Sequence, residues 1–186
     1  MKILALDLAS RAGWVYGDAL AVRPASGAWL LRERGQSYHR ASGLLGAKVR
    51  DFLELGVDQI WIEKFIDPAA QKRTEAILIS ILLRGAVDGV AECYDVPVHH
   101  VPVATARIAF CGKATAHPSR KPGAPAKPSW QIDRERMDTK QMIWRAAVKQ
   151  GYFDAGQRED HDASDAACVW SYAACKAGRT PPLVLV

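Results

Sequence analysis

The chain has 186 residues, of which 49% are hydrophobic and 24% are charged, and its formal net charge is +5. This composition supports a packed core and excludes a chain that is disordered throughout. The length predicts a single domain over residues 1–186. The longest apolar run, residues 76–83, is far shorter than the roughly 20 residues that cross a bilayer, so we expect a cytoplasmic protein without a membrane partner.

The first third of the chain predicts an antiparallel meander. Residues 2–8 form a short apolar run typical of a buried strand. Residues 14–17 and 28–32 indicate a second and a third strand, separated by turns rich in Gly, Pro and Ser. Residues 38–55 then have the apolar spacing of a helix, and Gly56 follows as a plausible C-cap.

The middle of the chain predicts a β-α-β unit. Residues 58–65 indicate a fourth strand, residues 69–94 a long and mostly apolar helix, and residues 96–101 a fifth strand. Such a unit has a right-handed crossover and a parallel strand pair. Helical spacing returns over residues 136–150 and 160–176. The order predicts an α/β fold whose mixed five-stranded sheet has three antiparallel strands, then parallel strands, and is flanked by helices.

Positive charge is concentrated in one segment. Residues 107–149 carry ten basic and three acidic side chains, a net charge of +7, which leaves −2 for the rest of the chain. This distribution is typical of a protein that binds a polyanion, and a solvated loop rich in lysine is the alternative. Within it, residues 107–134 contain four prolines, so we expect neither regular helix nor strand there. We interpret residues 112–134 as a basic, proline-rich insert.

The four cysteines form no C-x-x-C pair and no zinc-finger spacing. We expect them to be small, buried apolar side chains in a reducing compartment. They are Cys93, Cys111, Cys168 and Cys175.

Four carboxylates occupy places where an acidic side chain is unusual. Asp7 lies between two leucines near the end of the first strand, and Glu63 directly follows an Ile-Trp-Ile run. Asp162 and Asp165 are three residues apart at the start of the last helix, which puts them on one face. Each acid taken alone also has an ordinary alternative. Asp7 could lie in a turn, Glu63 could be a strand end facing water, and the acids of the last helix could serve as its cap.

Small residues favour a common location for these acids. Ala163, Ala166, Ala167 and Ala173 would let the last helix approach the sheet closely and bring its first turn towards the strands. Converging carboxylates repel one another unless a divalent cation neutralises them, and oxygen ligands suit Mg²⁺ or Mn²⁺ rather than Zn²⁺. Two such ions can activate a water and stabilise the leaving oxygen of a phosphodiester, while a basic arm holds the nucleic acid.

Three motifs in register resemble the RuvC-type Holliday-junction resolvases of the RNase H-like nuclease superfamily. They are Leu4-Ala5-Leu6-Asp7 leading through Gly13 to Gly17, then Ile62-Glu63, and finally Asp162-Ala-Ser-Asp165-Ala-Ala. The resemblance covers residues 1 to about 176 and is more specific for the superfamily than for junction resolution. The long insert implies a divergent member, such as one encoded by a phage.

The resemblance implies an RNase H-like fold and a crossover junction endodeoxyribonuclease, a structure-selective enzyme of DNA recombination and repair. It matches Asp7, Glu63, Asp162 and Asp165 to the family's catalytic, metal-binding carboxylates, with two Mg²⁺ or Mn²⁺ ions per site bridged by Asp7. Hydrolysis would leave a 5′-phosphate and a 3′-hydroxyl. Asp160 and His161 are candidates for residues that lie behind the metal ligands and orient a ligand or a water. The expected location is the nucleoid of a bacterial or phage-infected cell.

The resemblance also implies a DNA interface and a homodimer. Arg107 and Lys140 match basic positions close to the scissile strand, whereas Phe65 lies next to the position of the family's junction-stacking aromatic, which is Ile66 here. The helix over residues 69–94 is apolar on more than one side, which predicts burial in a dimer interface or, alternatively, within one chain. The expected DNA-binding residues are Lys64, Phe65, Arg107, Lys113, Arg120, Lys121, Lys127 and Lys140.

Other functions stay open at this point. The same fold could cut a flap, an RNA–DNA hybrid or linear DNA as a terminase does, and a non-catalytic binder of branched DNA is a further possibility. The full set of four carboxylates argues against a pure binder, which gains nothing from acids that face phosphates. An actin-like ATPase needs two such lobes, for which 186 residues are too few. We expect no organic cofactor.

Overall fold

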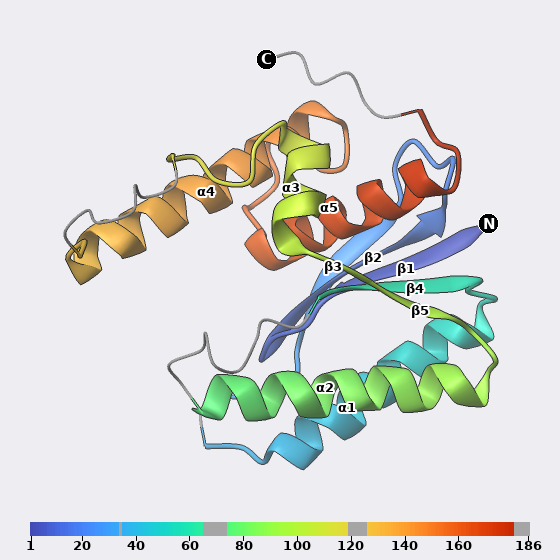
Figure 1. Ribbon diagram of the computed structural model, residues 1–186. Coiled ribbons are helices and arrows are strands. Elements are labelled where there is room, and N and C mark those ends of the chain that lie inside the picture. Colours follow the sequence, from blue (N-terminus) through green and yellow to red (C-terminus); the bar gives the residue numbers. More distant parts are fainter. Residues whose placement is uncertain (34, 65–73, 119–125, 181–186) are drawn as a thin grey trace.

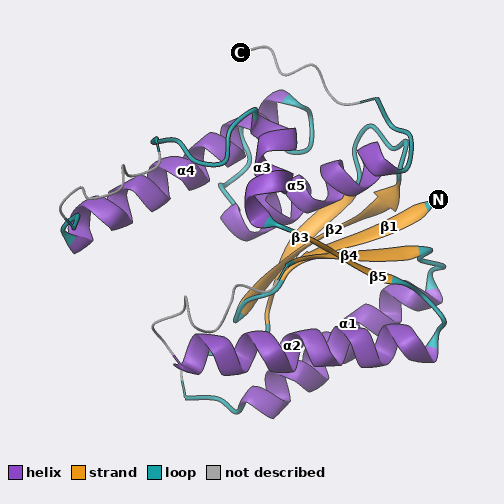
Figure 2. Ribbon diagram, in the orientation of Figure 1, coloured by secondary structure: helices purple, strands orange, loops and turns teal. Residues whose placement is uncertain are grey.

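The computed structural model describes residues 1–33, 35–64, 74–118 and 126–180. Five strands form one sheet in the order β3-β2-β1-β4-β5, between two layers of helices (Figures 1 and 2). β1, β2 and β3 are antiparallel, whereas β1, β4 and β5 are parallel, which confirms the predicted mixed sheet. The strands are β1 (Lys2–Asp7), β2 (Arg11–Asp18), β3 (Ala25–Leu30), β4 (Gln59–Glu63) and β5 (Val98–Val101).

The helices fall into two groups, one on each face of the sheet (Figure 1). α1 and α2 cover one face, and α5 covers the other together with α3 and the C-terminal half of α4 (Figure 2). The N-terminal half of α4 projects away from the sheet. The helices are α1 (Tyr38–Glu54), α2 (Thr74–Cys93), α3 (Val103–Cys111), α4 (Ser129–Lys149) and α5 (His161–Lys176).

Side chains of β1 alternate between two cores because successive residues of a strand point to opposite faces. Leu4 and Leu6 belong to the core beneath α1 and α2, and Ile3 and Ala5 belong to the core beneath α5. All four side chains are fully buried. The same alternation directs Asp7 to the face that α5 covers.

The alanine-rich face of α5 lies directly on the sheet, as its composition predicts. Its four alanines at positions 163, 166, 167 and 173 are at most 1% exposed. The approach is closest at Gly13 of β2, where a Cβ atom would lie 1.9 Å from the carbonyl oxygen of Asp162. Only glycine fits there without moving the start of α5.

The bounds of the strands differ from the predicted ones chiefly in β3, which lies at Ala25–Leu30 rather than over residues 28–32. Ser26 and Gly27 have low strand propensity, yet they pair with Val15 and Trp14 of β2. A Cβ atom at Gly27 would lie 2.9 Å from the Trp14 indole, so glycine makes room for this ring. Tertiary pairing therefore overrides local propensity at this edge.

The prediction that residues 107–134 lack regular structure is wrong at both ends of that range. α3 extends over Arg107 to Cys111 and ends at Gly112, whose φ of 75° is left-handed. α4 already begins at Ser129, behind Pro128. Its first turns escaped detection because they carry no apolar stripe facing a core, so helical periodicity is missing.

α2 is only partly covered within the chain. Leu83 and Val87 are fully buried against the sheet, whereas Leu78 and Ile81 are 47% and 50% exposed. Complete burial within one chain, one of the two predicted alternatives, is therefore wrong. None of the helices in the described residues is long and apolar enough to span a bilayer.

The described cysteines are all free thiols. Cys168 is buried as predicted and shares a hydrogen bond with the half-buried Cys111, whereas Cys93 is exposed, which contradicts a uniformly buried set. Cys93 lies at the end of α2, where the helix leaves the core.

Candidate active site

Two of the four carboxylates predicted from the sequence meet at the ends of neighbouring parallel strands. Leu6 of β1 pairs with Ile62 of β4, so Asp7 and Glu63 follow at the same edge of the sheet. Ile62 belongs to the core beneath α1 and α2, and the strand alternation therefore directs Glu63, like Asp7, to the α5 face.

The other two carboxylates come from the start of α5. Asp160 is the N-cap of this helix, and its side chain accepts a hydrogen bond from the backbone N–H of Ala163 at 3.1 Å. This cap starts the helix so that Asp162 lies in the first turn and Asp165 one turn later. The Asp165 side chain is 7% exposed, which is a costly position for an acid without a partner.

The four acids act on one another electrostatically. Burial and the charges of Glu63, Asp165 and Asp162 raise the pKa of Asp7 well above its ordinary value. Burial and the charge of Asp165 raise the pKa of Glu63 to about 7. We refer to Asp7, Glu63, Asp162 and Asp165 as the acidic cluster.

Guanidinium groups neutralise part of this cluster. Arg107 on α3 donates to Oδ1 of Asp165 at 2.9 Å, and Arg11 on β2 donates to Oδ2 of Asp162 at 2.6 Å. Although burial opposes it, the charges of Asp165 and Glu63 raise the pKa of Arg107. No three His, Cys, Asp or Glu side chains within the described ranges are arranged to hold a metal ion.

The donor set nevertheless suits a hard divalent cation. All four side chains of the acidic cluster offer only oxygen atoms, which Mg²⁺ and Mn²⁺ prefer. The raised pKa of Asp7, at a position where three other carboxylates add to the effect of burial, indicates an excess of negative charge. A divalent cation would relieve this excess without protonation of the acids.

Sequence reasoning missed two arginines beside the cluster. Arg11 bonds to both Asp160 and Asp162. Arg84 on α2 interacts with Glu63 and Asp7, and burial lowers its pKa. Arg84 could have been noticed because it is the only charged residue in the apolar stretch 76–87. Arg11 lies four residues after Asp7 and does not stand out in the sequence in this way.

The two residues predicted to act from behind the ligands have distinct surroundings. Asp160 caps α5 and pairs with Arg11, as described above. Nε2 of His161 lies 3.5 Å from Oε2 of Glu159. Its buried Nδ1 atom has no hydrogen-bond partner in the part of the chain that the structure describes.

The predicted DNA-binding residues lie in several places. Lys64 is exposed directly after β4, and Lys113 is exposed directly after α3. Lys127 forms an ion pair with Glu135 at 2.6 Å. Phe65, Ile66, Arg120 and Lys121 fall outside the described residues.

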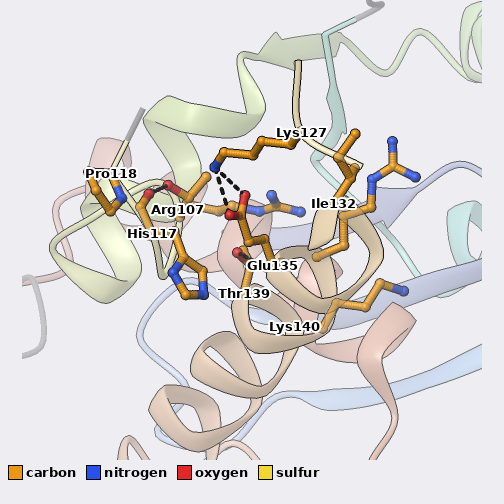
Figure 3. A pocket seen from close by; sticks show the side chains of 10 residues that line it. Arg107, His117, Pro118, Lys127, Ile132, Glu135, Thr139 and Lys140 are labelled. Atoms are coloured by element: carbon orange, nitrogen blue, oxygen red, sulfur yellow. Dashed lines mark hydrogen bonds and ion pairs between the residues drawn. The ribbon is translucent and has the colours of Figure 1, made fainter. Parts of the chain in front are cut away.

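A cavity of about 450 Å³ opens beside Arg107, between α3, residues 112–118 and α4 (Figure 3). In this view Lys127 reaches across to Glu135. The lining carries four basic side chains and one acidic one. Its residues are Arg107, Thr115, His117, Pro118, Lys127, Ile132, Glu135, Arg136, Thr139 and Lys140.

Comparisons with known proteins give structural neighbours only, since no protein-family model and no curated protein match the sequence. RuvC of Thermus thermophilus superposes with a TM-score of 0.65 at 16% identity, over 98% of this chain and all of that one. The same protein in complex with a Holliday junction substrate gives 0.65 at 14% identity, covering 98% and 99%. The yeast mitochondrial Holliday junction resolvase Ydc2 gives 0.52 at 13% identity, covering 94% and 80%.

These similarities show that the chain has the RuvC-type fold that the sequence motifs predicted. The superposition extends over nearly the whole chain, so the candidate site lies within the shared architecture.

Proposed function

We propose that this protein is a metal-dependent endonuclease that cuts branched DNA, with the four-way Holliday junction as its substrate. The observation that carries the proposal is the acidic cluster, whose members come from β1, β4 and α5 in a fold similar to that of RuvC. The similarity to a RuvC bound to a Holliday junction favours a junction over a flap or an RNA–DNA hybrid.

In this proposal the side chains of the acidic cluster, Asp7 among them, would hold two Mg²⁺ or Mn²⁺ ions. When bound, such ions supply activation of a water and stabilisation of the leaving oxygen in phosphodiester hydrolysis. Arg107 holds Asp165 by one oxygen and presents positive charge to the edge of the cavity shown in Figure 3.

The basic rim of that cavity would hold the sugar–phosphate backbone. Arg136 and Lys140 line this cavity. Among the described contacts, the ion pair of Arg136 is a long one of 3.9 Å and Lys140 has none, so both charges are available to phosphates. Lys127 is instead committed to Glu135. Lys64 and Lys113 are exposed and offer further positive charge to a nucleic acid.

The half-exposed apolar side of α2 supports a homodimer. Leu78 and Ile81 would be covered by the same surface of a second copy, as in an isologous interface. Two sites related by two-fold symmetry match the two strands that a resolvase must cut.

The direct test incubates the purified protein with a mobile four-way junction, a flap, a linear duplex and an RNA–DNA hybrid, in Mg²⁺ and in EDTA. We expect paired symmetric nicks in the junction, with Mg²⁺ only. Asp7→Asn should reduce cutting by more than the roughly 10- to 100-fold typical of a residue that merely supports a ligand, with junction binding intact.

The matched control is Asp51→Asn, the same change on the exposed surface of α1, which should cut at the wild-type rate. Wild-type cutting by Asp7→Asn would disprove the metal assignment. If only the RNA–DNA hybrid is cut, the hybrid and not the four-way junction is the substrate.

A further inference from the structure

Arg11, the first residue of β2, connects this strand to the start of α5. Its Nη1 and Nη2 atoms donate to Oδ1 and Oδ2 of Asp160 at 3.0 and 2.7 Å, across 149 residues of sequence. The same Nη1 atom donates to Oδ2 of Asp162 at 2.6 Å. One guanidinium is thus shared between the cap of α5 and a carboxylate of the acidic cluster.

Asp160 fixes the orientation of this guanidinium. Its two oxygens engage Arg11 in a fork, a geometry that sets the plane of the guanidinium as well as its position. Oδ1 also accepts from the backbone N–H of Ala163, which ties the carboxylate to the first turn of α5. Contacts therefore run from the α5 backbone through Asp160 and Arg11 to the Asp162 carboxylate.

We propose that Arg11, held by Asp160, is a positioning residue that fixes the Asp162 carboxylate for divalent-cation binding. This inference rests on the proposed function, in which Asp162 is a ligand. Arg11 engages one oxygen of Asp162 from outside the cluster and so restricts rotation of the carboxylate. The cation then meets an oriented oxygen instead of a rotating one, and less conformational entropy is lost on binding.

Two other roles make different predictions. If Arg11 instead blocks the cation by competing for Asp162, its removal should tighten metal binding. If its guanidinium, which is 46% exposed as a side chain, serves only to bind a DNA phosphate, its removal should weaken DNA binding and leave metal affinity unchanged.

The test compares Arg11→Gln, Arg11→Lys and Asp160→Asn with the wild type by calorimetric titration of Mn²⁺ in the absence of DNA. Loss of a residue that orients a ligand typically costs about 10-fold or more in metal affinity, and we expect this for Arg11→Gln. Arg11→Lys should be intermediate, because an ammonium keeps the charge but not the fork. Half-maximal cutting should require more Mg²⁺ in these variants than in the wild type.

The matched control is Arg23→Gln. Arg23 forms a comparable ion pair with Asp154, at 2.6 Å, between a loop of the sheet and the segment before α5, but away from the acidic cluster. Its loss should leave Mn²⁺ affinity unchanged. A melting temperature measured for each variant separates a loss of stability from a loss of affinity.

Unchanged or tighter Mn²⁺ binding by a folded Arg11→Gln would overturn the inference, as would failure of the wild type to bind Mn²⁺ at all. Failure of the proposed function gives a different result: the wild type binds Mn²⁺ but cuts no branched DNA, and the effect of Arg11 on Mn²⁺ affinity is still measured.

Discussion

Asp7 and Glu63 show how a buried acid at a strand end depends on its neighbours. Each follows an apolar run that places it at the sheet edge, and each is directed to the α5 face by the two-residue period of its strand. Burial and like charges raise the pKa values of both. In the absence of a cation these residues therefore favour protonation, which makes the stability of the protein depend on pH.

We predict that the metal-free protein loses stability as the pH rises from about 4.5 to 7. Within this window the folded state, with the pKa of Glu63 raised from 4.5 to about 7, binds more protons than the unfolded state, so the free energy of unfolding falls. At 1.36 kcal/mol per unit, the loss from this residue is at most about 3 kcal/mol.

Thermal unfolding in EDTA at pH 5, 6, 7 and 8 measures the effect. Glu63→Gln should flatten the dependence, whereas Glu54→Gln, an exposed change on α1, should leave it unaltered. A melting temperature that rises through this range in the wild type would contradict the prediction.

At Gly13 the prediction is steric. A Cβ atom there would lie 1.9 Å from a backbone oxygen of Asp162, so Gly13→Ala must push the start of α5 off the sheet. Overpacking of this kind typically costs about 2 kcal/mol, and it also displaces two carboxylates of the cluster. We expect a lower melting temperature and weaker Mn²⁺ binding.

Gly85→Ala on α2 is the matched control, because a Cβ atom at Gly85 meets nothing within 4 Å. This variant should be as stable as the wild type or more so, since alanine favours a helix. If both variants behave alike, close contact between Gly13 and α5 is not what stabilises the site.

At the scale of elements, α4 combines an anchored half with a projecting half. Ile143 and Ala147 near its end are fully buried, whereas Trp130 and Met137 are 66% and 48% exposed (Figure 1). Arg136 in the projecting half and Lys140 near the middle of the helix lie on the rim of the cavity. Such an element suits contact with a long polyanion better than packing within one chain.

We predict that the double variant Arg136→Ala/Lys140→Ala binds a four-way junction more weakly and with a smaller salt dependence. Each phosphate contact that is lost should reduce the slope of log K against log salt by about 0.9. Fluorescence anisotropy from 50 to 300 mM NaCl, in EDTA, measures it. Arg40→Ala/Lys48→Ala on α1, in the opposite layer, should leave the slope unchanged, and an equal fall in both doubles would argue against a specific role of α4.

The elements differ in how far they could be predicted from sequence. All five strands and the helices α1, α2 and α5 could be predicted from apolar runs or helical spacing, because each packs against a core. α3 was missed since only Pro102 separates it from β5, and the first turns of α4 were missed since no core lies behind them. The acidic cluster could be predicted because acids stand out in apolar strands. Arg11 could not, since its partners Asp160 and Asp162 are 149 and 151 residues away.

The whole molecule leaves an apolar surface on α2 without a cover. Leu78 and Ile81 are half exposed on α2, which lies on the opposite face of the sheet from α5 (Figure 2). We predict that the protein is a dimer in solution and that Ile81→Glu makes it monomeric, because a charge buried in an apolar interface costs several kcal/mol. Sedimentation velocity measures the change.

Leu20→Glu, at a side chain that is 71% exposed in the turn after β2, is the control and should remain dimeric. A wild type that sediments as a monomer both alone and with junction DNA would exclude the dimer. Monomeric Ile81→Glu should still nick the junction, but without coordination of the two cuts.

The contact of β1 with α5 joins the first element of the chain to the last one that the structure describes. During synthesis on the ribosome, β1 and β4 emerge long before α5, and the nascent chain at that stage lacks the helix that contributes half of the acidic cluster and covers that face of the sheet. A product that ends before α5 would therefore lack both the cover of this face and a complete candidate site, so that assembly of the site waits for synthesis of α5.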